Sequence, residues 1–157
     1  MTKLERWLTL VANVSVVAGI VFLAAEMRQN TAAILAQTRD SITEKQMEYL
    51  GWRATTPELA TAISTANDQG LAAMTVTERS LYSGWVSAQV REWENSFYQY
   101  RRGLFTQQEY EARRSHWRIE LNEEVFRFWW TAYLRTRFES DFRAEIDRIV
   151  ADVEQAQ

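Results

Sequence analysis

Apolar side chains dominate the chain from Trp7 to Ala25, a run of 19 residues without a charged side chain. As a helix, this run would be roughly 28 Å long at about 1.5 Å per residue, close to the hydrocarbon thickness of a bilayer. Charged residues stand on both sides, with Arg6 before the run and Glu26 after it. The pattern predicts a transmembrane helix, with residues 1–30 as a membrane anchor and its short N-terminal tail.

A cleaved signal peptide begins in a similar way, but two features favour a retained anchor. The apolar run is longer than the core of a signal peptide, which usually has about 7–15 residues. A cut after Ala25 would also lack the small residue expected two positions earlier, because Leu23 stands there. A buried core helix is the other alternative.

The apolar run contains small and polar residues at helical spacing. Ser15 and Gly19 are four residues apart, Ala12 lies on a neighbouring turn, and Asn13 is polar in the middle of the run. Small residues let two helices approach closely in lipid, and an amide gains from a partner there. We interpret Ala12, Asn13, Ser15 and Gly19 as a contact surface for another membrane helix, with ordinary variation in a single span as the alternative. Trp7 stands at the boundary of the run, where indole rings favour the headgroup region.

The helical pattern continues beyond the apolar run, because no Pro precedes Pro57 and no Gly lies between Gly19 and Gly51. We expect one long helix that ends at about Tyr49 or Leu50, before Gly51. A sparse apolar stripe would pack this extension on the following domain. The stripe consists of Ile34, Leu35, Ile42 and Leu50.

The next helix is predicted from Pro57 to about Asp68. Thr56 can cap it, Pro57 suits the first helical position, and Gly70 can end it.

Two capping boxes predict the two helices that follow, at residues 75–78 and 106–109, each with Thr and Glu three positions apart. The first of these helices should run to about Arg102 and stop at Gly103, and the second to about Glu120. Helical spacing places one set of apolar residues on a single face of the first. These are Val86, Val90, Trp93, Phe97 and Tyr100.

The last third of the chain predicts two more helices. Asn122 can cap a helix from Glu123 to about Arg135, and Ser140 or Asp141 can cap the last one. No alternating strand pattern is visible. We therefore predict an all-α fold, in which one N-terminal transmembrane helix continues into a bundle of about five further helices over residues 31–157.

Composition narrows the function classes. Hydrophobic residues make up 46% of the chain and aromatic residues 13%, enough for a packed core. The net charge of -3 argues against a nucleic-acid partner. The chain contains no Cys, which excludes disulfides and Cys-ligated metals.

The residue pattern gives little support for a catalytic or metal site. His116 lies one helical turn from Glu120 but has no Ser or Cys partner in a known pattern. A di-iron bundle needs two Glu-x-x-His motifs, and the chain has a single His. Glu92 and Glu94 point away from each other on a helix, so they do not form a carboxylate pair. We predict neither an enzyme nor a bound cofactor or metal.

Two groups of residues are candidates for a partner or headgroup surface. Arg101 and Arg102 lie on one side of the predicted helical hairpin, and Arg113 and Arg114 on the other. Salt bridges to the abundant Glu residues are the alternative for these four. Consecutive aromatic residues cannot all face one core, so Trp129 and Trp130 are the second group, with burial in the core as the alternative.

Basic residues flank the predicted span almost evenly. Lys3 and Arg6 precede it, while Arg28, Arg39 and Lys45 follow within 20 residues. Lys3 and Arg6 are close to the span, and the amino terminus adds a further positive charge on the same side. We therefore expect a cytoplasmic N-terminus and a periplasmic domain at a bacterial inner membrane.

Several segments together resemble a widespread group of small, uncharacterised bacterial proteins with one N-terminal span and a helical domain. The segments are GIVFLAAEMRQN at 19–30, TPEL at 56–59, WENSFYQYRRGL at 93–104 and FRAEID at 142–147. The resemblance implies this architecture and no catalytic residues.

From these patterns we expect a non-enzymatic, single-span accessory subunit. Its partners would be the bilayer and one or more integral membrane proteins, in a respiratory or photosynthetic complex for example, or a second copy of the chain. The alternative is a membrane-tethered sensor or small-ligand-binding module.

Overall fold

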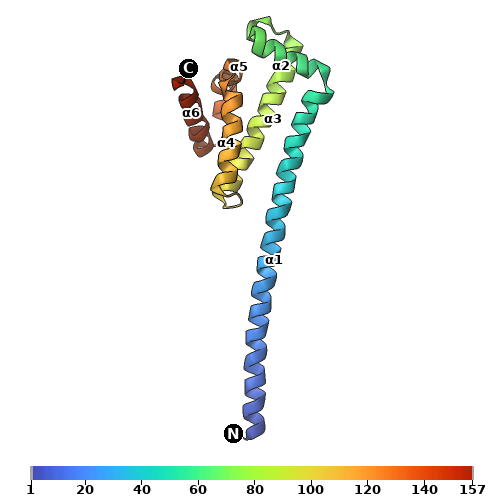
Figure 1. The fold of residues 1–157 in the computed structure, drawn as a ribbon, viewed down its shortest axis with the longest axis vertical. Coiled ribbons are helices and arrows are strands. Elements are labelled where there is room, and N and C mark those ends of the chain that lie inside the picture. Colours follow the sequence, from blue (N-terminus) through green and yellow to red (C-terminus); the bar gives the residue numbers. More distant parts are fainter. Residues whose placement is uncertain (1, 157) are drawn as a thin grey trace. The chain divides into compact units, whose positions relative to one another are not determined.

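A computed structural model describes residues 2–156 of the chain, and this part is helical, with short turns and no strand. Figure 1 shows the helices in chain order. The predicted all-α fold, with a long apolar N-terminal helix and five further helices, is confirmed. The α-helices are α1 (Lys3–Thr55), α2 (Pro57–Gln69), α3 (Val76–Arg101), α4 (Gln107–Asn122), α5 (Glu124–Trp129) and α6 (Ser140–Gln155).

The chain divides into two units, and the boundary lies within α1. The first unit ends at Ser41 and consists of the N-terminal part of α1, in which no described residue is buried. The second unit begins at Ile42 and holds the last turns of α1 together with α2–α6. We call this second unit the helical domain; it begins later than residue 31, where the sequence pattern places it.

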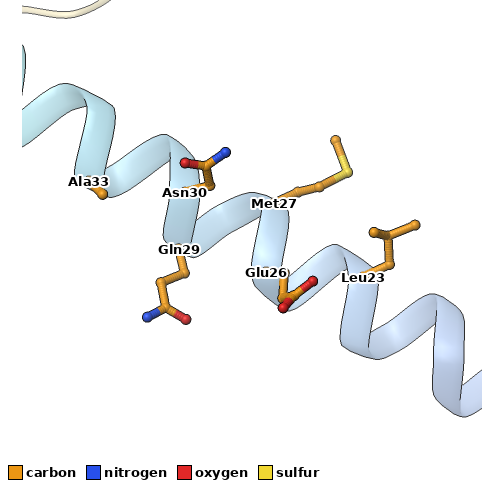
Figure 2. A pocket seen from close by; sticks show the side chains of 6 residues that line it. All are labelled: Leu23, Glu26, Met27, Gln29, Asn30 and Ala33. Atoms are coloured by element: carbon orange, nitrogen blue, oxygen red, sulfur yellow. The ribbon is translucent and has the colours of Figure 1, made fainter.

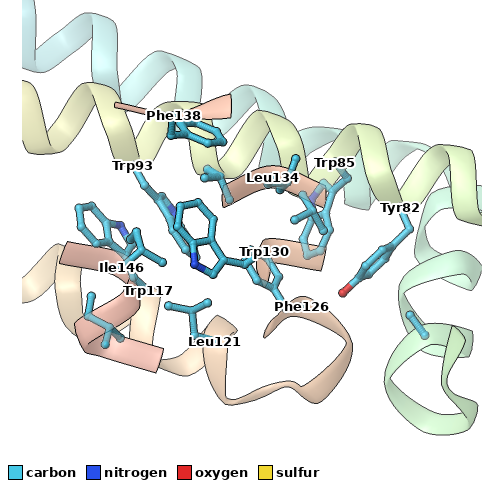
Figure 3. Close-up of a cluster of buried hydrophobic side chains, with 14 of the residues drawn as sticks. Tyr82, Trp85, Trp93, Trp117, Leu121, Phe126, Trp130, Leu134, Phe138 and Ile146 are labelled. Carbon is cyan, nitrogen blue, oxygen red and sulfur yellow. The ribbon is translucent and has the colours of Figure 1, made fainter. Parts of the chain in front are cut away.

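The core of the helical domain is built largely from aromatic rings. Trp93 of α3 stacks between Trp117 of α4 and Phe126 of α5, with ring centroids 5.5 Å and 5.3 Å away. Phe142 of α6 closes the core and is fully buried. Figure 3 shows the rings of Trp93, Trp117 and Phe126 meeting from separate helices. Aromatic contacts of this kind add about 0.5–1.5 kcal/mol per pair to the burial of the rings themselves.

Both predicted capping boxes are confirmed. The Thr75 hydroxyl accepts a hydrogen bond from the Glu78 backbone N–H at 3.2 Å, and the Glu78 carboxylate accepts one from the Thr75 backbone N–H at 2.7 Å. Thr106 and Glu109 repeat this exchange at the start of α4. Each box pairs N–H groups that the first turn of a helix leaves without a partner.

The predicted end of α1 at Gly51 is wrong, because the helix continues to Thr55. Gly51 keeps an ordinary helical conformation; the glycines with positive φ are Gly70 and Gly103. Pro57 stops the helix instead, since the residue before a proline is pushed out of the helical region. Thr56 accordingly has an extended backbone, with φ -118° and ψ 94°, and it caps α2 without a side-chain hydrogen bond.

The apolar stripe on α1 is only partly as predicted. Ile42 is buried, but Leu50 is 47% exposed and Tyr49 is buried in its place. Positions 42 and 49 are two turns apart and lie on the same face, whereas position 50 is rotated away from it.

Two predicted caps are also wrong. Asn122 is the last residue of α4, and Glu123 precedes α5 without a side-chain hydrogen bond. Glu139 caps α6, because its carboxylate accepts hydrogen bonds from the backbone N–H groups of Asp141 and Phe142 at 3.0 Å and 3.4 Å. Ser140 and Asp141 are thus the first residues inside that helix.

The predicted helix from Glu123 to Arg135 is interrupted. After α5 the backbone forms a π-helical turn, η2 (Trp130–Leu134), and then a short 3-10 turn, η3 (Arg135–Arg137). Phe126, Trp130 and Leu134 are all buried. They lie four residues apart, a spacing that keeps side chains on one face of a helix.

Candidate functional site

The run from Trp7 to Ala25 in α1 carries apolar residues on every side. Helix α1 is the one helix among the described residues that is long and apolar enough to span a membrane, and none of its most apolar window is buried. A helix that is hydrophobic all round needs an apolar environment around it. Its exposed apolar residues include Leu8, Leu10, Val11, Val14, Val16, Val17, Ile20, Val21, Phe22 and Leu23.

The predicted helix-contact residues lie on this exposed segment. Ala12, Ser15 and Gly19 share one face at spacings of three and four residues, whereas Asn13 lies away from that face. The Ser15 hydroxyl donates to the backbone carbonyl of Val11 at 2.8 Å, which satisfies it within the helix. A Cβ added at Gly19 would meet no atom within 4 Å, so this face is open.

Polarity changes sharply at the end of the apolar run. Figure 2 shows side chains of this region, all from α1, which project from different sides of the helix. Leu23 and Met27 are apolar, whereas Glu26, Gln29 and Asn30 are polar. At the other end of the run, Trp7 is 66% exposed. The apolar segment is therefore bounded by groups suited to a membrane–water interface.

The helical domain contains a buried carboxylate, Glu92 on α3, which is 6% exposed. Its Oε1 accepts hydrogen bonds from Gln46 Nε2 of α1 at 3.0 Å and from Ser96 Oγ at 2.6 Å. Arg113 of α4 donates to the same oxygen at 3.4 Å. This Glu92 network joins α1, α3 and α4 through one side chain.

Burial changes the acidity of the groups around this network. It raises the pKa of Glu92, and the hydrogen bond from Ser96 and the charge of Arg113 only partly oppose the effect. Burial also raises the pKa of Glu120, against the charges of His116 and Arg53. The pKa of Tyr49 rises to about 12 through burial and the nearby Glu92 charge. His116 itself is exposed on α4.

A second buried carboxylate, Glu145 on α6, is 8% exposed. Arg114 of α4 pairs with it, with 2.6 Å between Nε and Oε1, and Tyr110 donates to it at 3.3 Å. Arg148 pairs with its other oxygen at 2.8 Å. This cluster joins α4 to α6.

The four predicted arginines do not form one basic surface. Arg113 and Arg114 point inward to Glu92 and Glu145, which is the salt-bridge alternative. Arg101 forms an ion pair with Asp141 of α6. Arg102 is exposed at the end of α3. The expectation of a surface role is therefore corrected for Arg113 and Arg114, because buried carboxylates need a paired charge.

Trp130 also departs from the expected surface role. It is 1% exposed, and its Nε1 donates to Asp147 of α6 at 3.1 Å. Trp129 is half-buried, and its ring lies 4.6 Å from the ring of Tyr133. The exposed aromatic residues of this region are instead Phe128 at 44% and Tyr133 at 47%. With Trp129 they line a cleft of about 320 Å³ together with Leu71, Ala72 and Arg79.

Gln46 and Ser96 belong to the Glu92 network but were not predicted from the sequence. A signal exists for Ser96, since Gln89, Glu92 and Ser96 form a polar line on α3 beside its apolar face. All three are buried. Among residues 2–156, no group of three or more His, Asp or Glu side chains is close enough to hold a metal ion.

No family model matches the chain, and neither a curated protein nor a solved structure is significantly similar to it. The resemblance to small single-span bacterial proteins therefore stays a prediction.

Proposed function

We propose that the protein is a single-span membrane protein whose helical domain acts as a non-enzymatic accessory subunit of a larger membrane assembly. The observation that carries the proposal is the apolar part of α1, which is exposed on every side. Moving such a surface out of water is worth about 25 cal/mol per Å² of apolar area. A bilayer offers this environment to all faces of the helix at once.

The contact with a partner is proposed for the face of Ala12, Ser15 and Gly19. Small residues allow two helix backbones to approach, and van der Waals packing then drives association in lipid. Asn13 lies away from this face, so we propose it as a separate contact, because an amide in hydrocarbon gains from a hydrogen bond to a neighbouring helix. The partner is an integral membrane protein or a second copy of this chain, and respiratory or photosynthetic complexes are candidate hosts.

A pull-down of the full-length protein in mild detergent tests this proposal, with mass spectrometry of the proteins that remain bound. Gly19→Leu should remove the partner, because a leucine side chain holds the helices apart. Val14→Leu is the matched control, since position 14 lies away from the face of Ala12, Ser15 and Gly19 and from the face of Asn13, and it should keep the partner. Equal recovery of partners with both variants would contradict the proposal.

The same proposal places the N-terminus in the cytoplasm and the helical domain in the periplasm. Because the chain has no Cys, a single cysteine can be introduced on either side of the predicted span. In spheroplasts, a maleimide that cannot cross the membrane should label Val76→Cys and leave Thr2→Cys unlabelled. The opposite labelling pattern would reverse the orientation.

The second candidate is a membrane-tethered ligand-binding module. It is favoured by the cleft between Phe128, Trp129 and Tyr133, where the buried Nε1 of Trp129 has no hydrogen-bond partner. Arg79 on the rim would suit an anionic group. Binding of a small aromatic carboxylate that is lost in Arg79→Met would support this candidate, and absence of binding would remove it.

A further inference from the structure

A groove lies between the last turns of α1 and the middle of α3, within the helical domain. Its volume is about 260 Å³, which suits a small ligand rather than a cofactor. The residues that line it are Lys45, Glu48, Tyr49, Trp52, Ala88, Arg91, Glu92 and Asn95.

The two oxygens of Glu92 differ at this groove. The hydrogen bonds that Gln46, Ser96 and Arg113 donate all reach Oε1, so Oε2 has no partner among the described residues. Oε2 is also not sealed off from solvent, unlike the unpartnered nitrogens of Gln89 and Trp93. The side chain of Glu92 is held in place by one oxygen and offers the other to the groove.

The neighbouring cations leave this oxygen available. Arg91 lines the groove, but its guanidinium pairs with Glu94 at 2.8 Å and lies 4.2 Å from the ring centre of Phe138. Arg113 pairs with the other oxygen, Oε1, at 3.4 Å. Lys45 is exposed on the rim and forms no ion pair with Glu92.

A buried carboxylate oxygen without a donor is complementary to a charged N–H donor, since such hydrogen bonds are roughly twice as strong as neutral ones. Trp52, which is 40% exposed, and Ala88 provide an apolar flank beside it. We propose that this groove is a binding site for a small primary amine, with its ammonium group on Oε2 of Glu92 and its carbon chain against Trp52.

The test uses the full-length protein in lipid nanodiscs and titrates n-propylammonium by calorimetry, with propionate as the anionic probe of matched size. Binding of the amine without binding of propionate is expected. Glu92→Gln should weaken binding about tenfold or more, because the amide oxygen can still accept the three buried hydrogen bonds while an NH₂ donor replaces Oε2. Far-UV circular dichroism checks that this variant is folded.

Two further variants make the result specific. Lys45→Met removes the competing ammonium group from the rim and should strengthen binding several-fold. Glu58→Gln, on the exposed surface of α2, should leave binding unchanged. The proposal is overturned if the amine does not bind, if Glu92→Gln binds it as well as wild type, or if Lys45→Met weakens binding.

Discussion

Glu92 carries a charge into a part of the helical domain where most of its surface is removed from water. Ionised carboxylates are costly to bury unless they are paired and hydrogen-bonded. Ser96, itself fully buried, provides the shortest of the hydrogen bonds that Glu92 accepts. The stability of this region therefore depends on single side chains that contribute little apolar area.

Ser96→Ala should lower the free energy of unfolding by about 1–3 kcal/mol, because the buried Glu92 carboxylate loses the shortest of its hydrogen bonds, and a bond to a charged group contributes about this much. Denaturation of the full-length protein in mild detergent measures the change. Ser115→Ala is the matched control, since Ser115 is exposed and its hydroxyl bonds only to the Glu111 carbonyl of its own helix. The control should stay within about 0.5 kcal/mol of wild type.

Glu92 should also make stability depend on pH. Because burial raises its pKa, the folded protein keeps this proton at pH values where the unfolded chain has lost it. Its contribution to stability is therefore largest in acid and is lost as the pH rises from the ordinary value of 4.5 through the raised pKa. The charged groups around it are Lys45 and Glu48 of α1, Arg91 of α3, and Arg113 and His116 of α4.

Glu92→Gln isolates this effect, because glutamine does not titrate. The melting temperature of the variant relative to wild type should increase as the pH rises from about 4.5 towards neutral. A difference that stays constant with pH would show that Glu92 titrates alike in the folded and unfolded states.

At the scale of elements, the ends of the helices are set by local chemistry. The Thr75 hydroxyl accepts a hydrogen bond from the Glu78 backbone N–H, whereas Thr56 caps α2 without any side-chain hydrogen bond. The two threonines thus occupy the same kind of position with different contacts.

Thr75→Ala should accordingly cost about 1 kcal/mol of stability, the usual value for losing a cap hydrogen bond. Thr56→Ala serves as its control and should cost clearly less, because Pro57 rather than the threonine hydroxyl defines the start of α2. Chemical denaturation of both variants measures the difference. Equal losses would mean that the hydrogen bond in the Thr75 capping box contributes nothing to stability.

For the whole molecule, the exposed apolar segment of α1 has the largest consequence. Val16 lies near the middle of the charge-free run and is 62% exposed, and Val76 on α3 is 85% exposed. Exposing the whole apolar segment around Val16 to water would be unfavourable, whereas a single exposed valine such as Val76 on a domain surface is ordinary.

Val16→Asp should therefore reduce the share of the protein found in the membrane fraction, since an aspartate at the centre of a span costs about 2.5–3.5 kcal/mol on insertion. Val76→Asp should leave fractionation unchanged, because it adds the same charge to an exposed position of the helical domain. If both variants fractionate like wild type, α1 does not anchor the protein through this segment.

The expectations drawn from sequence succeeded where the signal was local. The capping boxes at Thr75 and Thr106 and the start of α2 at Pro57 depend on neighbouring residues alone, and they are confirmed. The caps at Asn122 and Ser140 failed because adjacent residues can also cap a helix.

For the candidate site, too, local features were predicted from the sequence and long-range contacts were not. The pattern of residues 7–25 by itself determined that residues 2–156 include an apolar helix long enough to span a membrane, and the capped periodic segments determined that the domain after it is helical. Only the tertiary structure decided that Arg113 and Arg114 turn inward to Glu92 and Glu145. Helical propensity and capping act within a turn or two of the chain, whereas desolvation and charge pairing depend on groups that only folding brings together.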